Sequence, residues 1–108
     1  MGFEYRLTFS DPNWYSANVA HIADRVRRLP HFKTELDGQE FRLKDESVDN
    51  SWSYDLRIFL RPQTIDIEVG GQTPTFYSDF RSIYDWIRRE TSAQLVDDDG
   101  IPIWEDSS

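Results

Sequence analysis

The chain has no cysteine, only two lysines among its 108 residues, and no long apolar run. Without cysteine it can form neither a disulfide nor a thiolate metal site. No stretch approaches the roughly twenty apolar residues that span a bilayer. Residues 1–6 lack the pattern of a secretory signal, and Arg6 stands where a myristoylation motif needs Ser or Thr. We therefore expect a cytoplasmic protein without a membrane anchor.

Motifs of catalysis and cofactor binding are also missing. No Gly-x-Ser-x-Gly elbow presents a nucleophilic serine, and two histidines, His21 and His31, are few for a metal site. Gly70-Gly71 lacks the lysine of a phosphate-binding loop. The Asp97–Gly100 segment lacks the ligand spacing of a calcium loop and predicts an acidic turn. We predict no catalytic residue, metal or cofactor, and we favour a protein that is not an enzyme.

What the chain does have is an uneven distribution of charge. Its net charge is -8. Residues 1–44 carry seven basic and six acidic side chains, a net charge of +1, whereas residues 45–108 carry five basic and fourteen acidic side chains, a net charge of -9. Such an excess of carboxylates disfavours nucleic acid as a partner and favours a basic protein.

The first half of the chain predicts a strand and a helix. Apolar side chains at alternate positions predict a half-buried strand at residues 3–9. Asp11 and Pro12 then form a helix start, as N-cap and first helical residue, and Pro30 ends the helix. Its apolar stripe has helical spacing and consists of Tyr15, Val19, Ile22, Val26 and Leu29.

Two hairpins follow. Asp37-Gly38 predicts a two-residue turn that pairs Leu36 with Gln39, Thr34 with Phe41 and Phe32 with Leu43. After an acidic loop, the alternating strands at 52–60 and 65–69 predict a second hairpin. Its expected pairs are Leu60 with Ile65, Ile58 with Ile67 and Leu56 with Val69.

A second helix starts at Thr73-Pro74, with Phe76, Phe80, Ile83 and Ile87 on one stripe. The remaining faces of the strands are charged, so both helices must cover the same face. The predicted fold is a two-layer α+β domain at residues 1–96 with an antiparallel sheet of about five strands, followed by an acidic C-terminal extension at 97–108. The order β-α-β-β-β-β-α resembles the helix-grip folds. The expected core comprises Phe3, Leu7, Ile22, Val26, Leu56, Ile58, Ile67, Phe80 and Ile83.

Two acidic clusters, each with a tryptophan, are the main candidates for a binding site. Carboxylates with an aromatic anchor suit a basic protein surface, although a solvated surface explains the same pattern. The candidate partner-binding residues are Asp45, Glu46, Asp49 and Trp52 in the first cluster, and Asp97, Asp98, Asp99 and Trp104 in the second. This hypothesis requires both clusters to share one side of the domain.

A second candidate surface lies on the first helix. Trp14, Asn18, His21 and Arg25 are spaced by four, three and four residues, and tryptophan and arginine are enriched among binding hot spots. The alternative is that Trp14 packs back on the loop that begins at Phe9.

Two functions remain open. The first is a non-enzymatic domain that captures or neutralises a basic protein, as an inhibitor, an immunity protein or an adaptor does. The second is a helix-grip pocket for a small molecule, which could include an enzyme, lined by Phe76, Phe80, Tyr54 and Trp52. A cavity beneath the second helix favours the pocket, and a filled core favours the binding surface. Neither the partner nor the oligomeric state can be read from the sequence.

Overall fold

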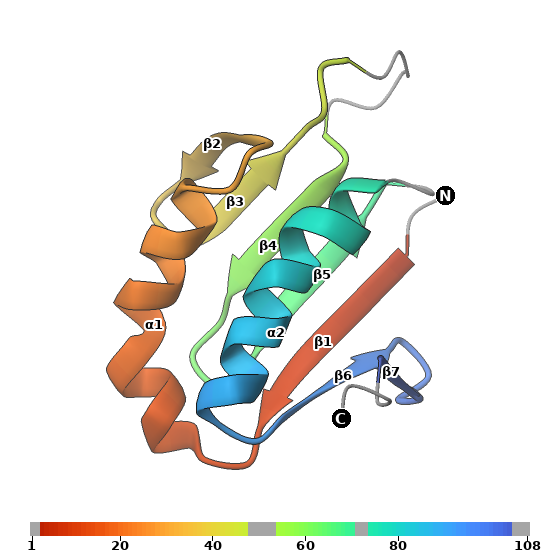
Figure 1. Cartoon of the computed structure of the whole chain (residues 1–108). Helices are drawn as coiled ribbons and strands as arrows, with labels where there is room; N and C mark the ends of the chain where they lie inside the picture. The colour runs from red at the N-terminus through yellow and green to blue at the C-terminus, as the bar shows by residue number, and fades with distance from the viewer. Residues whose placement is uncertain (1–2, 48–53, 71–73, 105–108) are drawn as a thin grey trace.

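Seven strands form one antiparallel sheet, which two helices cover (Figure 1). The computed structural model describes residues 3–47, 54–70 and 74–104. The strand order across the sheet is β2-β3-β4-β5-β1-β6-β7. Along the chain the elements are β1 (Phe3–Phe9), α1 (Pro12–Arg27), β2 (Phe32–Leu36), β3 (Glu40–Leu43), β4 (Leu56–Leu60), β5 (Ile65–Val69), the π-helical segment η1 (Phe76–Phe80), α2 (Arg81–Glu90), β6 (Ala93–Asp97) and β7 (Pro102–Ile103).

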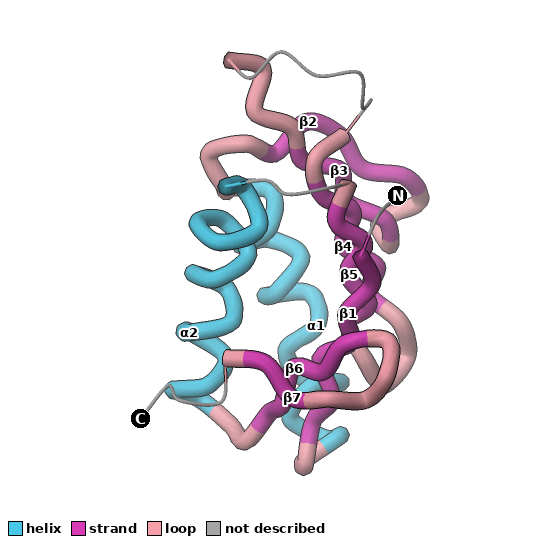
Figure 2. Tube along the Cα trace, turned by 90° about the vertical axis from the view of Figure 1, so that its right-hand side faces the viewer, coloured by secondary structure: helices cyan, strands magenta, loops and turns pink. Residues whose placement is uncertain are grey.

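Both helices lie on one face of the sheet, so the molecule has two layers (Figure 2). This confirms the predicted α+β class and the antiparallel sheet. The predicted count of about five strands is wrong, because β6 pairs with the other side of β1 and β7 pairs with β6. No helix in the described part of the chain is long and apolar enough to cross a membrane.

The first helix begins where the sequence predicts. The Asp11 carboxylate accepts hydrogen bonds from the backbone N–H groups of Asn13 and Trp14, and Pro12 occupies the first turn. Arg25 and Arg27 lie in the last turn, where positive charge interacts favourably with the helix dipole. The helix ends at Arg27, before Pro30.

The two hairpins differ in how well the sequence predicts them. All three predicted pairs between β4 and β5 are present. In the first hairpin, Asp37 and Gly38 form the turn, both with positive φ, and Gln39 N–H donates to the Leu36 carbonyl. Leu36 pairs with Glu40, however, so the register is shifted by one residue, and a bulge between Phe32 and Thr34 absorbs the difference. The Phe32–Leu43 pair is therefore correct, and the other two predicted pairs are wrong.

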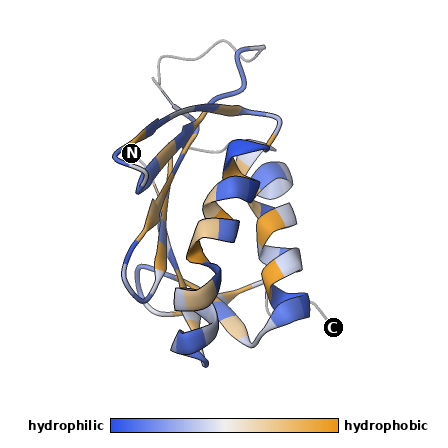
Figure 3. Cartoon of the chain, turned by 90° about the vertical axis from the view of Figure 1, so that its left-hand side faces the viewer, coloured by the Kyte–Doolittle hydropathy of each residue, from blue (hydrophilic) through white to orange (hydrophobic). Residues whose placement is uncertain are grey.

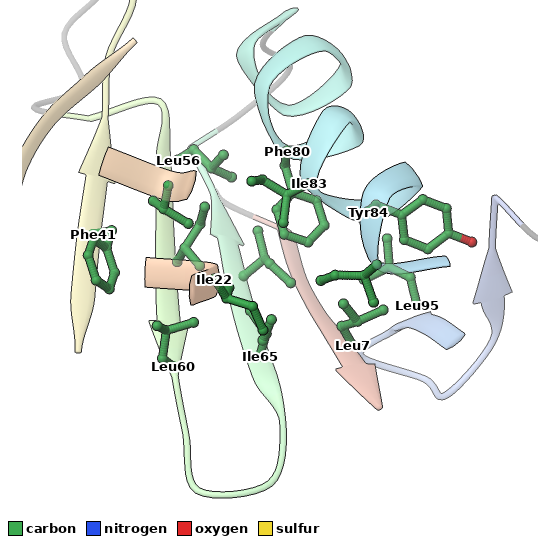
Figure 4. Close-up of a cluster of buried hydrophobic side chains, with 14 of the residues drawn as sticks. Leu7, Ile22, Phe41, Leu56, Leu60, Ile65, Phe80, Ile83, Tyr84 and Leu95 are labelled. Carbon is green, nitrogen blue, oxygen red and sulfur yellow. The ribbon is translucent and has the colours of Figure 1, made fainter. Parts of the chain in front are cut away.

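Apolar and polar residues alternate along the elements (Figure 3), and the apolar ones fill a single core between the layers (Figure 4). Eight of the nine predicted core residues are buried. Phe3 is the exception, with 51% of its surface exposed. It begins β1, and β6 pairs with β1 only from Tyr5 onward, so Phe3 has a strand on one side only.

Candidate functional site

The described members of the two acidic clusters lie far apart. Asp45 and Glu46 follow β3 at one end of the molecule, whereas Asp97, Asp98 and Asp99 form the turn between β6 and β7 at the other end (Figures 1 and 2). The predicted members Asp49 and Trp52 fall outside the described residues. The structure therefore does not bring these described carboxylates together into one surface, and their described members do not meet the requirement that both clusters share one side of the domain.

The β6–β7 turn is held by one of its own carboxylates. Asp97 Oδ1 accepts hydrogen bonds from the backbone N–H groups of Asp99 and Ile101, both at 2.9 Å. Gly100 takes a positive φ and donates to the Asp97 carbonyl. This is the acidic turn that the sequence predicts, and it leaves Asp98 and Asp99 exposed. Carboxylate oxygens of the three aspartates lie within 4.8 Å of one another, an arrangement that is common on protein surfaces without a metal.

Trp104, the predicted aromatic anchor of this cluster, is half-buried against the core. Its ring stacks on Phe76 at 4.8 Å, and the guanidinium of Arg81 lies 4.8 Å from its centroid. The Tyr84 hydroxyl donates to the Trp104 carbonyl at 2.9 Å. Trp104 has a positive φ of 57°, which a non-glycine residue adopts only when its surroundings hold it there. These contacts give Trp104 a structural role at the rim of the core.

The open face of the sheet, opposite the helices, bears a hollow of about 420 Å³ beside the same turn. Most charges around it are paired: Arg6 with Asp66 at 2.9 Å, and Arg57 with Glu68. These are cross-strand ion pairs, which are typical of a solvated sheet face. The lining residues are Glu4, Tyr5, Arg6, Phe59, Arg61, Asp66, Ile67, Glu68, Val96, Asp97, Asp98 and Gly100.

Some carboxylates beside the hollow remain without a cation. Glu4, Asp98 and Asp99 make no ion pair with any residue that the structure describes. The pKa of Tyr5 is raised above its ordinary value. Burial is the largest cause, and the nearby groups Tyr77, Asp97 and Asp98 raise the pKa further. We call Glu4, Asp97, Asp98 and Asp99 the acidic corner.

The second candidate surface, on α1, packs largely against α2. The Arg25 guanidinium lies 4.0 Å from the centroid of the Trp86 ring, and His21 meets the same ring edge-on at 5.3 Å. Trp14 lies 5.9 Å from Trp86 and also stacks on Phe9, which confirms the alternative packing expected for Trp14. Only 8% of Trp86 is exposed. The sequence analysis offered Trp14, His21 and Arg25 as a surface for a partner, and it did not predict their contacts with Trp86.

A further cluster escaped the sequence prediction altogether. Among the described residues, the buried polar side chains are Asp55, Thr75 and Asp79, and all three lie at the end of the sheet near His31. Asp79 Oδ2 accepts from the His31 backbone N–H and Asp79 Oδ1 lies 2.9 Å from His31 Nδ1. We call His31, Asp45, Asp55, Thr75 and Asp79 the polar junction. One sequence signal could have revealed it: Asp79 stands next to Phe80 and three residues after Phe76, on the apolar stripe of the second helix.

Comparison with known proteins supplies no family for this chain. No protein-family model, no curated protein and no solved structure matches it. The functional argument therefore rests on the geometry of the sites themselves.

Proposed function

We propose that the protein is a small acidic binding domain that captures or neutralises a basic protein partner through the acidic corner. The supporting observation is the surplus of negative charge beside the hollow on the open sheet face. Glu4, Asp98 and Asp99 have no cation among the described residues, while the neighbouring carboxylates Asp66 and Glu68 are already paired. Lysine or arginine side chains of a partner would form ion pairs with these carboxylates.

The proposed site contains other residues than the site expected from the sequence. It keeps Asp97, Asp98 and Asp99 and adds Glu4 from β1, because Glu4 and Asp98 line the same hollow. Asp45 and Glu46 lie at the other end of the molecule and belong to other contacts. The hollow supplies the concave surface that an acidic turn alone lacks.

A pocket of the helix-grip type has less support. The aromatic residues expected to line it pack on each other: Phe76 and Phe80 are buried and their rings stack at 5.8 Å. Phe76 also stacks on Tyr5 at 4.9 Å and on Trp104. Tyr54 donates its hydroxyl to Glu68 on β5, in the ion-pair network of the open face. These side chains act as parts of the core and the sheet.

The test compares two triple variants that remove the same charge from different places. E4Q/D98N/D99N empties the acidic corner of its unpaired carboxylates, while D37N/E46Q/E90Q removes three carboxylates elsewhere. Binding of deca-lysine is measured at several salt concentrations, with amide chemical shifts locating the contact. We expect the first variant to slow association several-fold and to weaken its salt dependence, because local charge steers encounter. The second should have a much smaller effect.

Two outcomes would contradict the proposal. If both triple variants weaken binding equally, only net charge matters and the corner is not a site. If deca-lysine fails to bind the unmodified protein at low salt, or shifts amides at the Asp45 end instead, the acidic corner does not receive a basic partner. Deca-glutamate serves as the matched negative control.

A further inference from the structure

The polar junction joins four segments of the chain that are distant in sequence. His31 precedes β2, Asp45 follows β3, Asp55 precedes β4, and Thr75 and Asp79 belong to the start of the second helical region. Asp55 Oδ2 accepts from the Asp45 backbone N–H at 2.7 Å and from the Thr75 hydroxyl at 3.2 Å. Its backbone also bonds to both neighbouring strands, donating to the Leu43 carbonyl and accepting from Gly70 N–H. The junction therefore fixes this end of the sheet to the helical layer.

Asp79 holds His31 in one orientation. Its two carboxylate oxygens lie 2.9 Å from the His31 backbone nitrogen and 2.9 Å from Nδ1, and Ser78 donates its hydroxyl to the same carboxylate. A buried acceptor at this distance keeps the proton on Nδ1 in either charge state of the ring. The charge of His31 therefore has its main effect at the other ring nitrogen.

That other nitrogen, Nε2, lies 3.6 Å from Asp45 Oδ2. The distance is too long for a hydrogen bond but within the range of an ion pair. An imidazolium ring attracts the Asp45 carboxylate. A neutral ring protonated on Nδ1 turns a lone pair toward it and attracts it no longer. The contact to Asp45 thus depends on the ring's charge, whereas the contact to Asp79 survives its loss.

We propose that His31 is a pH-operated latch, whose protonated ring holds the Asp45 carboxylate beside Nε2 and whose deprotonation releases that carboxylate while Asp79 keeps its hold. Lys44 N–H bonds to the His31 carbonyl, so the segment stays attached through its backbone. Asp45 N–H also stays bonded to Asp55 Oδ2, and Glu46 stays paired with Lys33, so the released part is the Asp45 side chain. The latch thereby controls the position of the Asp45 carboxylate.

The charged groups around the ring agree with this assignment. The carboxylates that act on it are Asp79 from η1 and Asp45 and Asp55 from the ends of β3 and β4. The hydrogen bond to Asp79 raises the pKa of His31 above 6.5 most strongly; burial opposes the rise, and the charges of the three aspartates add to it. Lys33, the next cation along β2, pairs with Glu46. The hydrogen bonds from Ser47 lower the pKa of Asp45, and the charge of His31 lowers it slightly further. Asp45 is therefore ionised whenever His31 titrates.

Histidine ring resonances give a direct test, because the chain contains only two histidines. The resonances are followed from pH 5 to 9 together with the backbone amides of Asp45, Glu46 and Ser47. We expect the His31 midpoint in the folded protein to lie above that of the same residue in urea. The three amides should move with this midpoint, while the Nδ1 proton signal persists at high pH.

Variants separate a latch from a merely structural histidine. D45N should lower the His31 midpoint and remove the pH response of residues 46 and 47, and it keeps the chain's other contacts at this site. H21Q assigns the resonances and should leave both observations unchanged. The proposal fails if the His31 midpoint does not differ between folded and urea-unfolded chains, if the segment amides do not follow it, or if D45N leaves it in place.

Discussion

The acidic corner and the polar junction are both rich in aspartate, but their carboxylates are held in opposite ways. At the junction, Asp55 and Asp79 are 2% and 3% exposed and accept hydrogen bonds from several segments. At the corner, the carboxylates of Asp98 and Asp99 are exposed and make no hydrogen bond or ion pair with a described residue. A buried carboxylate is tolerated only when it is hydrogen-bonded or paired. The comparison teaches that the same residue type supports the fold at one end and is exposed to solvent at the other.

The largest expected effect is a loss of folding stability when the polar junction is disrupted. D79A removes the buried acceptor of both His31 N–H groups and leaves them without this partner. Because the His31 side chain is 30% exposed, water replaces part of the lost contact, and the cost should be about 1–3 kcal/mol. Urea unfolding of D79A should show a loss of this size, with I58A, a cavity-forming core variant expected to cost about 2–5 kcal/mol, as a benchmark. A loss below about 1 kcal/mol would show that the junction does not support the fold.

A change of pH should have an intermediate effect on the free energy of unfolding. The pKa of His31 is raised in the folded protein, so its contribution to stability is fully present below the unfolded value and is lost as pH rises through the folded value. The free energy of unfolding should therefore fall between pH 6.5 and the folded midpoint, and H31Q should flatten this part of the curve. Urea titrations at several pH values check the sign. If the stability of the unmodified protein rises over the same pH interval, the prediction is wrong.

The smallest effect is expected at the corner. D98N and D99N remove exposed charges from a turn held mainly by Asp97 and backbone hydrogen bonds. Substitutions of this kind change stability by about 0.5 kcal/mol or less, and here relief of like-charge repulsion favours a small gain. Thermal unfolding at low and high salt measures it, with the difference from the unmodified chain shrinking at high salt. A loss above about 1 kcal/mol in either variant would mean that the corner is part of the fold.

Local signals in the sequence predicted most of the architecture. The β4–β5 pairs follow from alternating apolar residues on either side of the Pro62 loop, and α1 follows from Asp11, Pro12 and one apolar stripe. The pairing of β6 with β1 joins residues from opposite ends of the chain, and no local pattern encodes such a contact. The strand count was wrong for this reason.

The sites were harder to predict than the fold. Charge composition showed that the second half is acidic but not where its carboxylates lie, so Asp45 and Asp97 were expected on one side. The polar junction exists only because segments around residues 31, 45, 55 and 79 meet in space. Asp79 carried a signal, a carboxylate on an apolar stripe, whose meaning depends on the histidine that it meets.

The one-residue bulge in β2 affects one of the two exposed edges of the sheet. β2 is an outer strand, and an outer strand exposes unpaired backbone groups on which another chain can add a strand. The bulge falls at Lys33, so the strand is bent and charged where it would otherwise be flat. At the opposite edge, β7 is only two residues long and includes Pro102, which has no backbone N–H to offer. Both features disfavour the edge-to-edge pairing of this sheet with another chain.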